Sequence, residues 1–166
     1  MVHYYPTSKK ELKDLLRMSK EIFKCSVERF SEGYIVYVEE TGARVYIVDK
    51  TPIMIELKTR EKLPALHLLN KGICEIPYVV VDQGAVPRIL NGADVMAPGI
   101  IELSNFTQGA LVGVREPQRK AFIAVGKALM SSDEISSIKK GRAIKSLHHV
   151  GDKIWESIIE MLIKLQ

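Results

Sequence analysis

The chain has 166 residues, of which 46% are hydrophobic and 27% are charged, and this composition excludes a disordered protein. Its formal net charge of +4 suits an anionic partner, but Lys and Arg are interleaved with Asp and Glu, so charge alone does not separate a nucleic-acid-binding protein from one with an ordinary solvated surface. The sequence shows no signal-peptide pattern and no apolar run approaching the roughly 20 residues of a membrane-spanning helix, so we expect a soluble, cytoplasmic protein without membrane contacts.

The first 75 residues predict an α+β domain. Ser8 and Glu11 form a capping box that begins an amphipathic helix. Two runs of aromatic and β-branched residues flank Thr41-Gly42, which is typical of a β-hairpin. The elements expected in this half are a helix over 8–24, strands over 33–38, 44–49 and 53–57, and a short helix over 64–70. A helix packed on a small antiparallel sheet accounts for this pattern.

After Pro77 the chain changes to short apolar runs separated by glycine and proline, which is typical of a small β-barrel. The elements expected here are strands over 78–82, 94–101, 110–115, 120–129 and 143–148, and helices over 84–91, 131–140 and 152–165. We therefore expect two domains, one over 1–75 and one over 76–166 that includes the C-terminal helix. The apolar face of that last helix would dock on the barrel or contact a partner.

The run from Val79 to Trp155 resembles the PUA domain, named for pseudouridine synthases and archaeosine transglycosylases. The segments "VVVDQGAVPRILNGADVMAPGII", "AFIAVGKALMSSDEI" and "KKGRAIKSLHHVGDKIW" have the order and separation of that family. The preceding "LPALHLLNK" is similar to the linker of the family that includes the malignant T-cell-amplified-sequence protein and its yeast and archaeal relatives. Members pair an α+β pre-PUA domain with a PUA domain, and here the N-terminal half matches only in its linker and element order.

The resemblance implies an α+β protein whose second domain is a PUA β-pseudo-barrel that binds structured RNA or a tRNA acceptor end. Relatives act in translation initiation, reinitiation or ribosome recycling on the small subunit, and eukaryotic members work with a partner that carries an initiation-factor-like domain. We therefore expect a monomeric, non-catalytic protein that binds tRNA or small-subunit rRNA. The alternatives are an accessory subunit that delivers RNA to a modification enzyme and a small enzyme with an unrecognised site.

Small residues begin the predicted helix over 84–91. Gly84 and Ala85 allow close packing against another backbone and also expose N–H groups to a phosphate, and both roles are compatible. Gly92 tolerates a positive φ and ends the helix. In PUA domains this helix and the loop after it form part of the RNA surface, so by resemblance Arg88, Asn91 and Gly92 are expected RNA contacts. The alternative is that they are ordinary surface residues.

Cations farther along the chain are the second group of expected RNA contacts. By resemblance, Lys127 lies at the strand end that meets RNA in PUA domains. A basic cluster without acidic residues follows, and phosphate contacts there would give salt-dependent affinity without base selection. The cluster consists of Lys139, Lys140, Arg142 and Lys145. Its alternative role is a solvated helix end, where the helix dipole favours cations.

Metal-binding and catalytic motifs are not apparent, so no cofactor, metal or catalytic residue is expected. GxSxG, HExxH and phosphate-loop patterns do not occur. His148 and His149 are adjacent and would face opposite sides of a strand, without further metal ligands nearby. Cys25 and Cys74 lie beside apolar residues and outside any CxxC pair, which favours buried free thiols and leaves a disulfide as the alternative.

Overall fold

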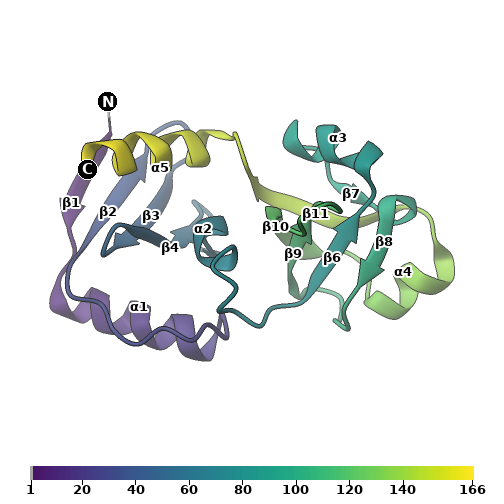
Figure 1. Cartoon of the computed structure of the whole chain (residues 1–166), viewed down its shortest axis with the longest axis horizontal. Helices are drawn as coiled ribbons and strands as arrows, with labels where there is room; N and C mark the ends of the chain where they lie inside the picture. Colours follow the sequence, from purple (N-terminus) through teal and green to yellow (C-terminus); the bar gives the residue numbers. More distant parts are fainter. Residues whose placement is uncertain (1) are drawn as a thin grey trace. The chain divides into compact units, whose positions relative to one another are not determined.

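The computed structural model describes residues 2–166, and they fold into two compact units (Figure 1). The first unit combines the chain up to Glu75 with the C-terminal segment Gly151–Gln166. The second unit is the continuous segment Ile76–Val150. Within the described residues, no helix has both the length and the apolar character needed to cross a membrane.

A five-stranded antiparallel sheet forms the centre of the first unit, with its strands in sequence order. The strands are β1 (His3–Pro6), β2 (Gly33–Val38), β3 (Ala43–Val48), β4 (Thr51–Glu56) and β5 (Lys62–Pro64). The predicted hairpin is β2–β3, and Gly42 takes a positive φ in its turn. The sequence does not predict β1, because all four of its residues are exposed and so lack the apolar alternation of a half-buried strand.

Two helices, α1 (Lys9–Glu21) and α5 (Lys153–Lys164), cover opposite faces of this sheet (Figure 1). The predicted capping box begins α1: the Ser8 hydroxyl accepts a bond from the Glu11 N–H at 3.1 Å, and the Glu11 carboxylate accepts one from the Ser8 N–H at 2.8 Å. A short helix, α2 (Leu66–Leu69), packs against β4. The ring of Trp155 on α5 stacks on His67 of α2, with centroids 4.6 Å apart.

The C-terminal helix α5 differs from the expectation that it belongs to the second domain. It contacts β2 and β3, and it buries Ile154, Ile158 and Met161. These contacts make α5 part of the first unit. The amphipathic pattern shows which side of the helix is apolar, but it carries no information about the surface that covers that side.

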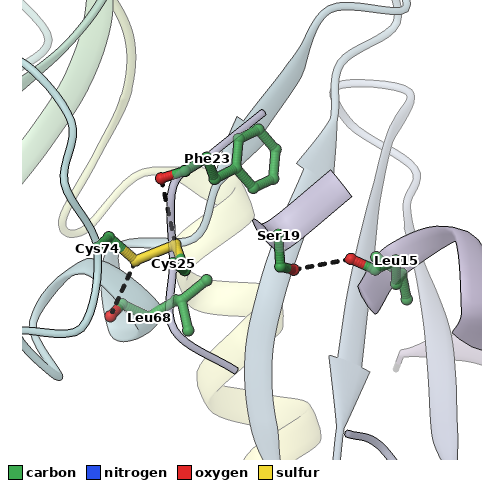
Figure 2. Close-up of a disulfide and its surroundings, with 6 residues drawn as sticks. All are labelled: Leu15, Ser19, Phe23, Cys25, Leu68 and Cys74. Atoms are coloured by element: carbon green, nitrogen blue, oxygen red, sulfur yellow. Dashed lines mark hydrogen bonds between the residues drawn. A yellow bond between two sulfur atoms is a disulfide. The ribbon is translucent and has the colours of Figure 1, made fainter. Parts of the chain in front are cut away.

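A disulfide joins Cys25, which follows α1, to Cys74, which follows α2 (Figure 2). The two backbones also form an isolated antiparallel bridge, in which the Ser26 N–H donates to the Ile73 carbonyl at 2.8 Å. The favoured prediction of free thiols is therefore wrong, and the alternative of a disulfide is correct. The two cysteines are 49 positions apart, and such a spacing in sequence does not indicate whether two side chains meet.

A nearly closed sheet of six strands forms the second unit, in the order β7-β11-β10-β9-β6-β8. All neighbouring strands are antiparallel except β6 and β9. The strands are β6 (Tyr78–Val81), β7 (Val95–Met96), β8 (Ile100–Leu103), β9 (Leu111–Arg115), β10 (Phe122–Ala128) and β11 (Arg142–His149). The short helices are η1 (Gln83–Ala85), α3 (Val86–Leu90), η2 (Ala97–Gly99) and α4 (Ser132–Ile138). This arrangement confirms the expected α+β fold with a barrel-like second half.

The barrel core consists mainly of aliphatic side chains from most of these elements, including Val79, Ile89 and Ile144. Within the barrel, β10 and β11 approach each other closely at Gly126, where a Cβ atom would collide with the carbonyl oxygen of Lys145. The pairing shifts register beside this glycine, which is typical of a β-bulge. The predicted strand over 94–101 is split into β7 and β8 by η2, where Pro98 cannot donate a ladder hydrogen bond.

Candidate nucleic-acid interface

A cavity of about 540 Å³ opens on the second unit between α3, β7 and the beginning of β11. Its floor is largely apolar and includes Ile89 and Val95. Three of the predicted RNA-binding residues line it: Ala85, Arg88 and Arg142. These residues come from separate parts of the sequence, so the fold creates a site that combines an apolar floor with two guanidinium groups.

The beginning of η1 is built by Asp82, which follows β6. Its carboxylate accepts a hydrogen bond from the Ala85 N–H at 2.9 Å and so acts as the helix cap. Its own N–H donates to the Gly99 carbonyl at 2.8 Å, which attaches η2 to the same corner. A Cβ on Gly99 would lie 3.4 Å from that of Ala85, so small residues allow η1 and η2 to pack together. Gly84 is not sterically required, because a Cβ there would meet only the Asp82 carboxylate at 3.5 Å.

Asp94 positions Arg142 at the rim of the cavity. One Asp94 carboxylate oxygen accepts a bond from the Ser146 N–H at 2.9 Å, and the other lies 2.9 Å from Nη1 of Arg142. The Arg142 side chain remains 65% exposed. A guanidinium has five N–H donors, so its single bond to Asp94 leaves donors for a phosphate. Both carboxylates of the cavity, those of Asp82 and Asp94, thus have structural roles.

Two lysines form a second cationic feature on the same sheet. Lys127 of β10 and Lys145 of β11 are direct cross-strand partners, and both are exposed. Because the two residues are opposite each other in an antiparallel pair, both side chains lie on the same face of the sheet. We refer to Lys127 and Lys145 as the cross-strand lysine pair.

The basic cluster over 139–145 is divided by the fold. Lys139 ends α4 in the left-handed conformation, with a φ of 58°, and lines a separate groove beside β8. Lys140 lies in the exposed loop that follows, where the Gly141 carbonyl accepts a bond from the Ala97 N–H at 2.8 Å. This bond attaches the loop to η2, next to the cavity. Only Arg142 of the cluster lines the cavity itself.

Asn91 and Gly92 end α3 outside the cavity lining. Asn91 is the C-cap residue, and Gly92 has a φ of 93°, as its predicted role as a helix stop requires. A Cβ on Gly92 would lie 3.4 Å from Nε2 of His149, so this turn lies against β11. His148, the neighbour of His149, is fully buried.

Sequence reasoning missed Asp94 and Met96 as residues of the site. Met96 is 44% exposed, although it is a large hydrophobic residue, and it lines the cavity. The strand β7 has only two residues and forms an edge of the sheet, so the inward and outward alternation of a longer strand cannot be recognised. Across residues 2–166, we find no group of three or more His, Cys, Asp or Glu residues that could hold a metal ion.

The comparisons with known proteins agree with this geometry. The model of the PUA domain family matches residues 77–150. The chain is 39% identical over 154 residues to the uncharacterized protein MJ1432 of Methanocaldococcus jannaschii, which covers 91% of this chain and 94% of that protein. It is 30% identical over 128 residues to Translation machinery-associated protein 20 of Saccharomyces cerevisiae, which covers 73% of this chain and 70% of that protein.

The solved structure of the hypothetical protein PH0734.1 from Pyrococcus horikoshii is also similar. It has a TM-score of 0.77 at 32% sequence identity, covering 93% of this chain and 98% of that one. The fold and the family match therefore define a PUA-domain protein, with the PUA domain in the second unit. The chain belongs to the family of PUA proteins that includes MJ1432 and Translation machinery-associated protein 20, which confirms the branch expected from the linker motif.

Proposed function

We propose that the chain is a non-catalytic, cytoplasmic RNA-binding protein of the translation machinery. The observation that carries this proposal is the placement of Arg88 and Arg142 beside one apolar cavity in a PUA fold. Its RNA would be a tRNA acceptor end or small-subunit rRNA. The name of the yeast relative supports the assignment to translation.

The chemistry of the cavity suits the end of a nucleic-acid strand. Its volume of about 540 Å³ lies within the usual range of ligand sites, and its apolar floor can cover an unstacked base. The guanidinium groups of Arg88 and Arg142 can pair with phosphates on either side of that base. The engagement of Asp82 and Asp94 in structural bonds supports a binding role over general acid or base catalysis.

The cross-strand lysine pair and Lys140 would extend the contact along the RNA backbone. Such contacts contribute affinity that weakens with salt and does not depend on sequence. The remaining predicted contacts, Gly84, Asn91, Gly92 and Lys139, stay predictions, and so does a partner with an initiation-factor-like domain.

Binding of the purified chain to tRNA with and without its 3′ CCA end, over a salt series, tests the RNA proposal. We expect the double variant Arg88→Ala, Arg142→Ala to bind tRNA at least about tenfold more weakly. The slope of the logarithm of the binding constant against the logarithm of the salt concentration should fall by about one for each phosphate contact that is lost. Replacing Arg142 by Lys instead of Ala should retain only part of the affinity, because an ammonium group cannot form the bidentate hydrogen bonds that a guanidinium forms with phosphate. Arg17→Ala, on the exposed side of α1, is the matched control.

The RNA proposal is wrong if the double variant binds tRNA as tightly as the unaltered chain. Co-sedimentation with purified small ribosomal subunits tests the role in translation separately. The role in translation is wrong if the protein binds tRNA but does not sediment with the small subunits in a sucrose gradient at any subunit concentration.

A further inference from the structure

The strand β8 forms an open edge of the barrel sheet. It is last in the strand order, and within the described residues its only ladder partner is β6. Its exposed residue Ile101 is 60% accessible, although it is a large aliphatic side chain. An exposed apolar edge strand offers unpaired backbone donors and acceptors to another extended chain.

A groove of about 600 Å³ lies alongside this edge. One wall is β8, including Ile100 and Ile101, and the facing wall is α4, including Ile135 and Lys139. The groove therefore has a helix on the side opposite the open edge. A single added strand would lie about 5 Å from β8, whereas a second copy that paired through its own edge would bring a whole sheet to this side of the barrel.

The charges around the groove favour carboxylates. Glu102 is the one acidic residue among those that line it, and its carboxylate lies 2.8 Å from Nζ of Lys120. The hydrogen bond from Lys120 lowers the pKa of Glu102, and the ion pair with Lys120 balances the negative charge of this carboxylate. Lys139 then gives the groove a net positive charge, and Lys140 follows it in the exposed loop.

The same lining argues against a nucleic acid as the occupant. It contains no aromatic side chain on which a base could stack, and the open strand edge is complementary to a peptide backbone. We propose that the groove between β8 and α4 binds an extended peptide segment of a partner protein, which adds a strand to β8 and presents aliphatic side chains alternating with carboxylates. This mode of binding combines main-chain hydrogen bonds with pockets for alternate side chains.

The test uses a display library of random linear peptides, selected against the whole chain. We expect the enriched pool to show alternating aliphatic and acidic residues. In NMR spectra of the chain, addition of a synthetic peptide from that pool should shift the backbone amide signals of residues 100–103 and 135–139. Ile101→Asp and Lys139→Glu should each weaken its binding about tenfold, as expected for residues that anchor an interface.

Matched controls separate these effects from loss of folding. Ile163 is an equally exposed isoleucine on α5, at 64%, and Lys20 is an exposed lysine on α1. Ile163→Asp and Lys20→Glu should bind the peptide like the unaltered chain. Unchanged tRNA binding by Ile101→Asp would separate this groove from the RNA site and show that the second unit of the variant is folded.

Several outcomes would overturn the proposal. A selected pool without the alternating pattern, or one that binds the Ile101→Asp variant equally well, contradicts it. Shifts of amide signals outside residues 100–103 and 135–139 alone would show that the peptide does not bind in the groove between β8 and α4. A concentration-dependent dimer that perturbs 100–103 without peptide assigns the edge to a second copy, and displacement of the peptide by single-stranded RNA at those amides assigns it to nucleic acid.

Discussion

Reduction of the Cys25–Cys74 disulfide should destabilise the first unit without dismantling it. The bond connects the chain after α1 to the chain after α2. In the reduced state the local packing can persist, because each sulfur already lies near a carbonyl oxygen (Figure 2): that of Phe23 at 3.4 Å from Cys25 and that of Leu68 at 4.0 Å from Cys74. The main effect of reduction is therefore on the unfolded chain.

The size of this effect follows from the length of the closed loop. With the two cysteines 49 positions apart, loop-closure entropy gives about 4 kcal/mol in favour of the oxidised protein at 25 °C. Typical domains have unfolding free energies of about 5–15 kcal/mol, so the disulfide would supply a large share of the stability of the first unit. In a reducing compartment the first unit would lose that contribution.

Guanidinium unfolding, followed by circular dichroism with and without reductant, measures the difference. The chain has two cysteines, so reductant acts at this one site, and a Cys25→Ala, Cys74→Ala variant should not respond to it. Thiol titration of the denatured, unreduced protein supplies an independent check. Two free thiols per chain, or the same unfolding midpoint with and without reductant, would refute the reasoning.

Two further predictions concern stability. The hydrogen bond from the Ser31 hydroxyl lowers the pKa of Asp49, so its stabilising contribution is present above the unfolded pKa of about 4 and is lost as pH falls through the lower folded value. Asp49→Asn should therefore be less stable at pH 7, by at most about 1 kcal/mol for this exposed side chain, and denaturant unfolding at lower pH should show the difference disappearing. Gly126→Ala should cost at least about 2 kcal/mol, because its methyl group would collide with the Lys145 carbonyl. Thermal unfolding should show a much smaller change for Gly84→Ala, and equal changes for the two alanine variants would contradict the predicted collision.

Local signals in the sequence predicted local structure well. The Ser8 and Glu11 capping box, the Gly42 turn and the Gly92 helix stop all depend on residues close together in the chain, and all three are present. The strand β1 could not be predicted in this way, because its stability depends on pairing with β2 and its side chains carry no burial pattern.

The features that were missed are long-range ones. Arg88 and Arg142 reach the same cavity through the fold of the sheet, whereas Lys139, close to Arg142 in sequence, lines another groove. The pairing of Cys25 with Cys74 likewise depends on where distant segments lie. Residue types identified the candidates, but only the topology decides which of them act together.

The second unit is an uninterrupted segment, while the first is completed by α5 after that segment has ended. During synthesis, all of residues 76–150 will have left the ribosomal tunnel before the helix that covers β2 and β3 is available. The first unit therefore cannot be completed before the second one has been synthesised, although N-terminal domains usually fold first. Until α5 arrives, one apolar face of the nascent N-terminal sheet remains uncovered, so chains that end prematurely near Val150 would be substrates for chaperones and proteases.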